Sequence, residues 1–583
     1  MKKLLKSFTK KDYLLMVVAL GFIVCQVWLD LTMPDFTSKL TATVSSGNVT
    51  LGDIWYNGGM MLLCAFGSLA CSILCGFIVA KIASSFSKNT RENLFNTVST
   101  FSAEEMNKFS TPSLITRTTN DVDQLHRFIA MGLQLFIKAP ILAIWAICKI
   151  STSSVQWTLA TVICVVVIVL VVSLIVALCI PKFKKVQKLT DDLNNATREN
   201  LSGVRVVRAF NAENYQEQKF EKANTNLAKN QLFTSKVTGL MSPVLTICMN
   251  GLTLAIYWIG AILINNAKIS EKATIIGNMA AFTQYALQVV MAFMMLIMMF
   301  IILPRVIVST KRVIQVLNTK AKILDGNLTD SNETTYGKVE FRNVNFCFPD
   351  GANNALENIN LTINGGETVA IIGATGSGKT TILDLLSRAY DVTRGEILID
   401  DINIKDYSLD ELQSKISIAN QKATLFKGTI KSNVIYGFDE QIADNDARIN
   451  KALNIAGANF VYELKDGINS EVSQGGTNFS GGQKQRISIA RAVFKDSEII
   501  AFDDSFSALD YKTDALVRKN IKENLLNKTI IIVAQRIGTI MNADKIIVLD
   551  EGKIVGVGKH KELLEKCPIY KEIALSQLSK EEL

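Results

Sequence analysis

The sequence Thr368-Val-Ala-Ile-Ile-Gly-Ala-Thr-Gly-Ser-Gly-Lys-Thr380 decides the fold of the second half of the chain. Its first part, residues 368–372, is a mainly apolar run that predicts a buried strand, and the helix-forming residues 382–386 follow its end. Between them lies the pattern GxxxxGKT. Glycines there let backbone N–H groups curl around an anion, and the helix N-terminus adds its positive dipole end. The segment therefore predicts a phosphate-binding loop rather than a structural glycine turn.

Two further segments extend this phosphate loop into a nucleotide site. Residues 498–504, EIIAFDD, form an apolar strand pattern that ends in acid, where the Asp503 carboxylate can hold a metal through water. Residues 479–483, FSGGQ, open a helix and offer a second set of backbone donors to phosphate. Alone, FSGGQ could be a helix cap with a glycine turn, but its place between the other two segments favours a phosphate contact. Lys379 is expected to reach the β- and γ-phosphates of ATP, and the Thr380 hydroxyl to ligate Mg²⁺.

The chain ahead of Pro304 is apolar in long runs. Six of them approach the ~20 residues that ~30 Å of hydrocarbon requires. The expected spans are residues 13–33, 57–82, 128–150, 157–180, 240–264 and 274–303. Short, cation-poor loops alternate with long, mixed-charge ones, and five lysines precede the first span. The positive-inside rule then places both termini in the cytoplasm of an integral membrane protein, which we expect in a bacterial plasma membrane.

The composition agrees with a membrane half joined to a soluble half, because a hydrophobic fraction of 49% accompanies a charged fraction of 20%. The net charge of +9 could indicate nucleic acid, but the basic residues cluster at cytoplasmic helix ends. Topogenic and lipid-facing charge is therefore favoured, and six spans exclude a soluble ATPase that acts on nucleic acid. The ten cysteines lie mostly in or beside the spans without CxxC spacing, so we expect small hydrophobes and not metal ligands.

The two long loops, residues 83–127 and 181–239, have helical periodicity, so the membrane helices are expected to continue into the cytoplasm. Each pair would end in a turn, at residues 119–123 and 202–210. No buried acidic or basic residue is expected in the central stretches of the spans, and hence no relay for proton coupling.

The sixth span carries methionines on one helical face, at Met291, Met295 and Met298, with Ile302 one turn further. Flexible thioethers suit a promiscuous apolar surface that could line a drug or lipid cavity. Helix packing or lipid contact explains the same residues equally well.

The ordered motifs resemble the ATP-binding cassette of ABC transporters. They are GATGSGKT, Gln421, FSGGQ, the strand ending at Asp503, SALD at 507–510 and VAQR at 533–536. The six spans, with NDVDQL and ENLSGVRVVRAFNAE in the long loops, resemble the multidrug-exporter branch, and the resemblance covers nearly the whole chain. It implies a six-helix all-α transmembrane domain fused to a C-terminal α/β P-loop cassette. The implied parts are a transmembrane domain at 1–308, a linker at 309–338 and the cassette at 339–578.

The resemblance also implies roles for single residues. Phe348 would stack on adenine, where the family usually has Tyr, and Gln421 would couple Mg²⁺ and the γ-phosphate to the membrane domain. Two cassettes would pair head to tail, so that the FSGGQ segment completes the partner's site. The implied nucleotide-binding set is Phe348, Gly373, Ala374, Thr375, Gly376, Ser377, Gly378, Lys379, Thr380, Thr381, Ser480, Gly481, Gly482, Gln483 and Asp510. The implied metal set is Thr380, Gln421 and Asp503, and the implied catalytic set is Asp504, Gln535 and Gln421.

Two catalytic positions depart from the family's pattern. Asp504 stands where the family has the Glu that orients the attacking water, and its carboxylate lies roughly 1–1.5 Å further back, a misplacement that can cost ~100-fold in rate. Gln535 stands where the family has His, and Gln can donate a hydrogen bond but carries no charge or proton. The two histidines, His126 and His560, lie outside the motifs. A third departure is the absence of the usual Glu-Arg pair from residues 470–476.

These departures predict a half-transporter that binds ATP and Mg²⁺ but hydrolyses ATP slowly. Because its FSGGQ segment is intact, the chain is expected to form a heterodimer with a second subunit that has Glu and His at these positions and an irregular signature. The leading hypothesis is export of hydrophobic or amphipathic, drug-like or lipid-like compounds. A lipid flippase, a peptide exporter, and an ATP-gated channel or regulatory subunit remain open, whereas an importer is disfavoured by the fused exporter-type architecture.

Overall fold

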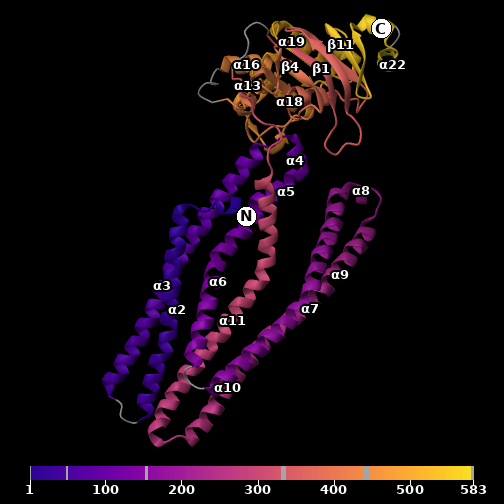
Figure 1. The fold of residues 1–583 in the computed structure, drawn as a ribbon. Coiled ribbons are helices and arrows are strands. Elements are labelled where there is room, and N and C mark those ends of the chain that lie inside the picture. The colour runs from indigo at the N-terminus through magenta and orange to yellow at the C-terminus, as the bar shows by residue number, and fades with distance from the viewer. Residues whose placement is uncertain (1, 47–49, 152–154, 330–335, 439–445, 579–583) are drawn as a thin grey trace. The chain divides into compact units, whose positions relative to one another are not determined.

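The computed structural model describes residues 2–46, 50–151, 155–329, 336–438 and 446–578. The chain divides into two units (Figure 1). The first unit is Met1–Ser99 with Pro112–Thr319, and the second is Lys320–Leu583 with the inserted segment Thr100–Thr111. The second unit therefore includes a short piece of chain from within the first half.

The first unit is helical throughout its described residues. Its helices are α1 (Lys2–Leu5), α2 (Lys10–Ser45), α3 (Leu51–Ser99), α5 (Thr111–Thr116), a π-helical turn (Arg117–Asp121), α6 (Val122–Ser151), α7 (Val155–Ser202), α8 (Val204–Ala209), α9 (Glu213–Gly239), α10 (Met241–Asn266) and α11 (Ile269–Asn318). Within the described residues, six helical stretches are long and apolar enough to cross a membrane. Five expected spans lie inside these stretches, and the sixth overlaps the stretch Glu271–Met298. The prediction of six membrane helices is confirmed.

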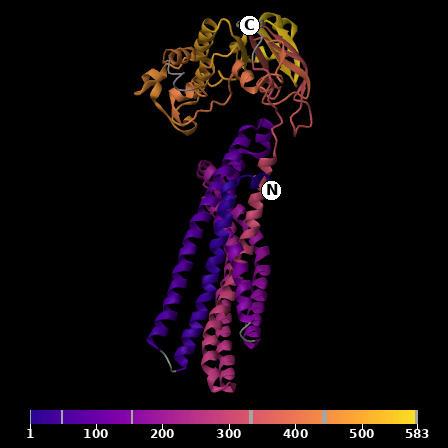
Figure 2. The same ribbon diagram turned by 60° about the vertical axis from the view of Figure 1, so that its left-hand side comes forward.

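Helices α2, α3, α6 and α11 run side by side, while α7 packs on α9 and α10 (Figures 1 and 2). A buried apolar cluster joins α2, α6, α7, α10 and α11 through residues such as Leu31, Trp157 and Phe282. The backbones of α2 and α11 approach closely at Gly277, where a Cβ atom would lie 2.3 Å from the Ser38 carbonyl oxygen. Glycine is therefore required at this crossing.

The first cytoplasmic turn is not where the sequence predicted it. Residues 117–121 are one π-helical turn between α5 and α6, so the predicted turn at 119–123 is wrong. Asp121 is buried there, accepts a hydrogen bond from Ser309 at 2.8 Å and pairs with Arg312 at 3.3 Å. These contacts with α11 explain why polar residues that are typical of turns remain helical.

The chain instead turns through α4 (Ala103–Phe109), which belongs to the second unit. Its Asn107 side chain donates to the Tyr390 hydroxyl at 2.9 Å, and its Glu104 pairs with Lys322 at 2.9 Å. In the second long loop, α7 ends at Ser202 and the short helix α8 precedes α9. A break between two long helices at 202–210 is therefore confirmed, but residues 204–209 form a helix and not a simple turn.

The expectation of uncharged central stretches is also wrong. Asp30 of α2 and Lys138 of α6 lie within expected spans and pair at 3.2 Å, and Asp35 and Lys149 pair at 2.7 Å. All four side chains are half-buried. Charges that pair between helices are tolerated in a membrane because each neutralises the other.

The second unit is built on two main sheets. The antiparallel sheet has the order β2-β1-β4-β5, from β1 (Val339–Phe346), β2 (Leu356–Ile363), β4 (Arg394–Ile399) and β5 (Ile402–Asn403). The larger sheet has the order β12-β11-β3-β10-β9-β6, from β3 (Thr368–Gly373), β6 (Ile416–Ala419), β9 (Ile499–Asp503), β10 (Thr529–Val533), β11 (Lys545–Asp550) and β12 (Lys553–Gly558). All neighbours in it are parallel except β11 and β12. A short pair, β7 (Gly428–Thr429) and β8 (Glu471–Val472), completes the strands described.

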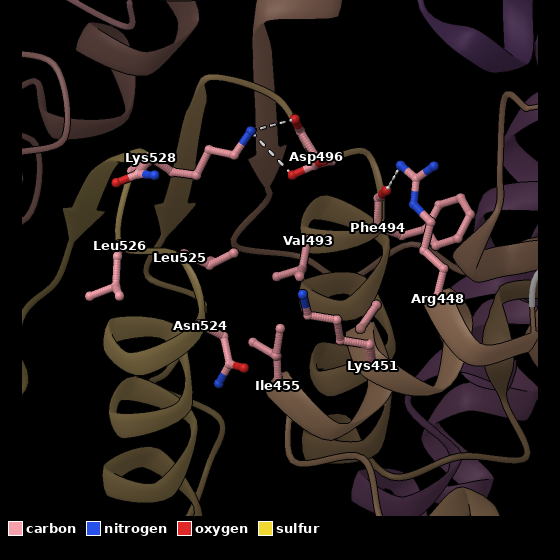
Figure 3. A pocket seen from close by; sticks show the side chains of 12 residues that line it. Arg448, Lys451, Ile455, Val493, Phe494, Asp496, Asn524, Leu525, Leu526 and Lys528 are labelled. Carbon is pink, nitrogen blue, oxygen red and sulfur yellow. Dashed lines mark hydrogen bonds and ion pairs between the residues drawn. The ribbon is translucent and has the colours of Figure 1, made fainter.

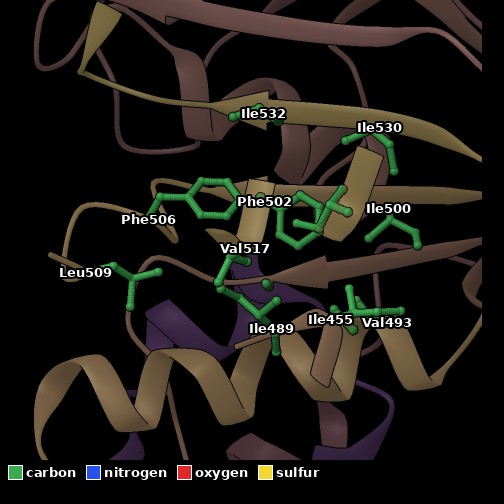
Figure 4. Close-up of a cluster of buried hydrophobic side chains, with 14 of the residues drawn as sticks. Ile455, Ile489, Val493, Ile500, Phe502, Phe506, Leu509, Val517, Ile530 and Ile532 are labelled. Carbon is green, nitrogen blue, oxygen red and sulfur yellow. The ribbon is translucent and has the colours of Figure 1, made fainter. Parts of the chain in front are cut away.

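Helices cover the larger sheet. They are α12 (Lys379–Leu386), α13 (Leu409–Lys415), α14 (Ile430–Val434), α16 (Asp446–Ile455), α17 (Phe460–Glu463), α18 (Gly481–Phe494), α19 (Tyr511–Asn524), α20 (Ile537–Ile540), α21 (His560–Lys566) and α22 (Pro568–Gln577). Side chains alternate along each strand, so Ile500 and Phe502 of β9 enter the core against α18 (Figure 4). Ile499 and Ala501 enter the opposite core, shared with α12 and the antiparallel sheet. A parallel sheet buried on both faces is the α/β cassette that the sequence predicted.

The residues expected to form the linker, 309–338, are divided among several structures. Helix α11 continues to Asn318, and Leu328 pairs with Tyr407 in an isolated β-bridge of the second unit. Residues 330–335 lie outside the described residues.

A buried ion cluster ties the two sheets and α13 together. The Lys415 ammonium donates to Asp400 at 2.8 Å and to Glu498 at 3.0 Å, and the side chains of Lys415 and Asp400 are 2% and 0% exposed. The backbone N–H of Lys338 donates to the other Asp400 oxygen at 3.0 Å. Removing the ammonium would leave a buried carboxylate without its counter-charge.

We therefore expect Lys415→Met to lower the free energy of unfolding of this unit by about 3–5 kcal/mol, because an uncompensated charge stays buried. Calorimetric unfolding of the purified protein measures the loss. The control Lys519→Met removes a side chain that is 69% exposed, and should change the free energy by no more than about 0.5 kcal/mol. Equal stabilities of the two variants would contradict the prediction.

Candidate functional site

The phosphate loop joins β3 to α12, as the sequence predicted. Gly376 and Gly378 have φ of +86° and +98°, a region that L side chains rarely adopt. A Cβ atom on Gly373 would lie 2.1 Å from the Leu549 carbonyl oxygen, whereas one on Gly376 would meet nothing within 4 Å. The loop is thus tightly packed on the side facing the sheet and open at Gly376, as a cradle for an anion requires.

Lys379 lies within this loop. Its ammonium donates to the carbonyl oxygens of Gly373 at 2.9 Å and Ala374 at 2.7 Å, and the residue is 8% exposed. Burial lowers the pKa of this ammonium, and the nearby Asp504 and Asp503 oppose the shift. The Lys379 ammonium can exchange these carbonyl oxygens for phosphate oxygens with little movement of its side chain.

The acidic strand end lies beside the first turn of α12. Thr380 donates through its hydroxyl to Asp503 at 3.2 Å, and Asp503 is 6% exposed at the end of β9. Burial raises the pKa of the Asp503 carboxyl. One hydroxyl and one carboxylate fit Mg²⁺, which is usually held by one or two protein oxygens together with substrate phosphates and water. Consistently, the described residues contain no group of three His, Cys, Asp or Glu that could hold a metal alone.

Asp504 and Gln535, the two residues that depart from the family's pattern, are hydrogen-bonded to each other. One carboxylate oxygen of Asp504, Oδ2, accepts from Gln535 Nε2 at 3.1 Å and from Gln421 Nε2 at 3.3 Å. Burial raises the pKa of the Asp504 carboxyl, and the hydrogen bond from Gln421 opposes the shift. The three expected catalytic residues therefore lie together, with one oxygen of the carboxylate occupied by two amide donors.

The backbone holds this cluster rigidly. Asp504 has φ of +46° and donates its N–H to the Val533 carbonyl oxygen at 2.9 Å. A non-glycine residue in this region is strained, and such strain recurs at functional sites. The side chain of Asp504 is therefore directed by the junction of two strands and not by a flexible loop.

Three supporting residues escaped the sequence analysis. Ser505 donates to the Ala419 carbonyl at 2.7 Å and Gln485 to the Asn420 carbonyl at 3.1 Å, which fixes the segment before Gln421. Gln577 of α22 donates to the Gln535 carbonyl at 2.8 Å and accepts from the Ile537 N–H at 2.8 Å. No motif surrounds Gln577, and it is 42 positions from Gln535, so no sequence signal pointed to it.

The FSGGQ segment caps α18. Ser480 accepts from the Gln483 N–H at 3.4 Å, and the Gln483 side chain accepts from the Ser480 N–H at 2.9 Å. A Cβ atom on Gly482 would lie 3.2 Å from the Ala508 carbonyl oxygen, so the segment adjoins residues 507–510. Asp510 caps α19 by accepting from the Thr513 N–H at 2.9 Å. Within the described part of the chain, no hydrogen bond joins residues 480–483 to the phosphate loop.

Phe348 follows β1 and is 36% exposed. Its ring packs at right angles on Tyr390, with centroids 5.5 Å apart, and on Phe346 at 4.8 Å. The two aromatic contacts hold the ring while about a third of the residue stays accessible, as stacking on a base would require. The two histidines have other partners, since His126 bonds Ser87 at 3.1 Å and His560 bonds Tyr570 at 2.7 Å.

A surface cavity of about 470 Å³ lies elsewhere on the second unit, between the C-terminal ends of α16, α18 and α19 (Figure 3). Two of its cations are already engaged: Lys528 pairs with Asp496 at 3.1 Å, and Arg448 donates to the Phe494 carbonyl at 2.7 Å. None of the motif residues lines it. The cavity therefore does not compete with the motif cluster as the nucleotide site.

The comparison with known proteins supports the family resemblance inferred from the motifs. Residues 16–293 match the family described as "ABC transporter transmembrane region", and residues 356–507 match that described as "ABC transporter". An uncharacterized ABC transporter ATP-binding protein of Mycobacterium tuberculosis is 37% identical over 92% of this chain and 90% of its own length. The uncharacterized ABC transporter ATP-binding protein YfiB of Bacillus subtilis is 32% identical over 99% of this chain and 98% of its own.

Two further similarities concern exporters. The ATP-dependent lipid A-core flippase of Francisella tularensis is 29% identical over 89% of this chain and 84% of its own. A solved structure of a bacterial Atm1-family ABC exporter with ATP bound matches with a TM-score of 0.80 over 97% of this chain and 98% of that one. At 23% sequence identity, this match shows a shared fold.

We expect Lys379→Ala to weaken ATP binding to this chain by roughly 10- to 100-fold, because a charge-assisted hydrogen bond to phosphate is lost. Photolabelling of this subunit with azido-ATP measures the effect. Lys519→Ala, an exposed lysine of α19, serves as the control and should label like the wild type. Undiminished labelling of Lys379→Ala would refute the assignment.

Proposed function

The chain belongs to the ABC transporter superfamily, with an exporter-fold transmembrane domain fused to a nucleotide-binding domain, and on this basis we propose that it is the slowly hydrolysing half of a heterodimeric exporter. As a member of that family it is an integral membrane protein and an ATPase-coupled transporter. The finer proposal concerns its partner, its own ATP site and its cargo. The hydrogen-bonded cluster of Asp504, Gln535 and Gln421 is the observation that carries it.

This site keeps the residues that would bind nucleotide. The phosphate loop, Lys379, Thr380 and Asp503 are together in the geometry described, and Mg²⁺ held there would neutralise the β- and γ-phosphates. Nothing about Asp504 or Gln535 interferes with that binding. We therefore assign tight binding of ATP and Mg²⁺ to this chain.

The hydrolytic step is weakened for two reasons. Asp504 is one methylene shorter than Glu, and its Oδ2 already accepts two amide hydrogen bonds, so its lone pairs are less available to orient water. Gln535 offers an amide in place of an imidazole, so it cannot carry a proton or a positive charge to the γ-phosphate. Both changes spare binding and affect only the transition state.

The intact FSGGQ segment favours a different subunit as partner. Ser480, Gly481 and Gly482 form a capped helix start that makes no hydrogen bond to the phosphate loop among the described residues, which suits service to an opposite site. In a homodimer both sites would carry the weakened pair. A partner with Glu and His at these positions, and an irregular signature of its own, gives the complex one rapid site.

For the cargo we propose hydrophobic or amphipathic, drug-like or lipid-like compounds, exported across a bacterial plasma membrane with the cassette in the cytoplasm. Met291 and Met298 are 51% and 60% exposed on α11, which supports a flexible apolar surface along the pathway. The similarity to a lipid A-core flippase supports a lipid-like substrate.

The proposal predicts a gain of function. We expect the double variant Asp504→Glu with Gln535→His to raise hydrolysis at this chain's site about 10- to 100-fold, because it restores the reach of the carboxylate and the imidazole donor. Vanadate trapping of labelled nucleotide in the purified heterodimer reports each site separately. The wild-type complex should trap nucleotide mainly in the partner. A purified homodimer that hydrolyses ATP rapidly at two equivalent sites would refute the proposal.

The signature segment gives a second prediction. Gly481→Asp should abolish most hydrolysis by the complex, because it would place a carboxylate beside the partner's bound γ-phosphate. Azido-ATP labelling of this chain should persist, which separates the effect from misfolding. The equivalent change in the partner's signature is the matched control and should cost much less activity. Equal losses from the two changes would argue against asymmetric sites.

A further inference from the structure

Two ion pairs lie within the membrane-spanning helices. Lys138 of α6 pairs with Asp30 of α2 at 3.2 Å, and Lys149 of α6 pairs with Asp35 of α2 at 2.7 Å. On helix α2, Asp30 lies in the middle of the helix and Asp35 little more than one turn further toward its C-terminus. Asp30 and Lys138 lie inside the expected spans, whereas Asp35 lies just beyond the span 13–33 and Lys149 lies two residues before the end of α6. Charges within a span are costly, so they mark substrate or ion pathways far more often than packing positions.

A backbone feature of α2 makes room for this polar cluster. Pro34 lacks an N–H, so the carbonyl oxygen of Asp30, four residues earlier, has no partner within the helix. The Gln288 side chain of α11 donates to that carbonyl at 3.0 Å. The Tyr285 hydroxyl of α11 donates to the Leu31 carbonyl at 3.1 Å. Three helices, α2, α6 and α11, therefore contribute to one polar region of the first unit.

The charged groups keep part of their surface accessible in the single chain. The side chains of Lys138 and Asp30 are 20% and 28% exposed, and those of Lys149 and Asp35 are 38% and 40% exposed. Hydrocarbon would not solvate this surface. For Asp30 and Lys138 the accessible side must therefore face protein or a water-filled pathway in the assembled transporter, whereas Asp35 and Lys149 lie nearer the ends of the spans.

Each carboxylate of the two pairs also accepts a hydrogen bond from a neutral hydroxyl. Asp30 also accepts from the Ser68 hydroxyl at 2.5 Å, and Asp35 also accepts from the Tyr285 hydroxyl at 2.5 Å. Each hydroxyl binds the carboxylate oxygen that the lysine does not use. When a lysine turns away, its aspartate therefore keeps a hydrogen bond. The ammonium groups lie at the ends of flexible four-carbon stems, so they can turn toward a ligand while the aspartates keep these hydrogen bonds.

We propose that Lys138 and Lys149 bind the anionic headgroup of an amphipathic substrate, while Asp30 and Asp35 stay in place on Ser68 and Tyr285. The shared chemistry is a phosphate, sulfate or carboxylate attached to an apolar body. The same helices also build a buried apolar cluster, which includes Leu31 of α2 and Phe282 and Val289 of α11. This inference rests on the proposed export function and narrows its substrate class to anionic amphipaths.

Binding to the complete transporter in phosphatidylcholine nanodiscs tests it. Three fluorescent probes share the same acyl chain. Lysophosphatidic acid is anionic, the choline ester is cationic and the glycerol ester is neutral. Lys138→Met and Lys149→Met should each weaken binding of the anionic probe about tenfold, the effect of one lost charge-assisted hydrogen bond, and leave the neutral probe unchanged. Lys39→Met, which removes a lysine of α2 that lies outside the cluster, is the control. Unchanged affinity for the anionic probe in both cluster variants would overturn the proposal.

Removing a carboxylate separates recognition from helix packing. Asp30→Asn frees the Lys138 ammonium from its competitor, so binding of the anionic probe should be retained or tightened. If the pair served only to join α2 and α6, Asp30→Asn would weaken binding as much as Lys138→Met, and the proposal would fall. Competition by glycerol 3-phosphate tests whether binding requires the apolar body of the substrate. If glycerol 3-phosphate competes as strongly as the lipid probe, an amphipathic substrate is excluded.

Transport assays keep this inference distinct from the export function. ATP-dependent movement of all three probes without headgroup preference would overturn the inference and support export. Headgroup-selective binding without ATP-dependent movement of any probe would support the inference and count against export.

Discussion

The parallel pairing of β3, β10, β9 and β6 is the constraint on which the nucleotide site depends. Parallel strands end at the same edge of a sheet, so the segments that follow them gather there. The strand register aligns Val533 with Asp503 and with Ile371. This alignment brings the phosphate loop, the carboxylates of Asp503 and Asp504, and the segment before Gln535 to one edge of the sheet. The strand β6 brings Gln421 to the same place through Ala419. Segments separated by more than a hundred residues thus form one site.

This constraint explains what could be predicted from the sequence. The six spans and the strand–loop–helix pattern are local signals, because apolar length and glycine spacing act within single elements. The proximity of Asp504, Gln535 and Gln421 could be anticipated from motif order. Their mutual hydrogen bonds could not, because the tilt of each side chain depends on Ser505, Gln485 and Gln577, which lie in no motif.

The two predictions that the structure contradicts, the first turn and the uncharged spans, failed for physical reasons. NDVDQL contains residues that are typical of turns, yet Asp121 is buried against Ser309 and Arg312 of α11, and this distant contact keeps the segment helical. The ion pairs were not predicted because the mean hydropathy of a span stays high when a single charged residue lies among many apolar ones. Asp30 and Lys138 are 108 positions apart, so only the packing of α2 on α6 makes them a pair.

The inserted segment Thr100–Thr111 has a mechanical consequence. Helix α4 is bound to the nucleotide-binding unit through Asn107 and Glu104, yet its chain continues directly into α3 on one side and into α5 and α6 on the other. A displacement of that unit would therefore be passed to α3 and to α6 through the continuous chain. Helix α6, which carries Lys138 and Lys149, is thus joined to α4 by the chain itself and not only by side-chain contacts.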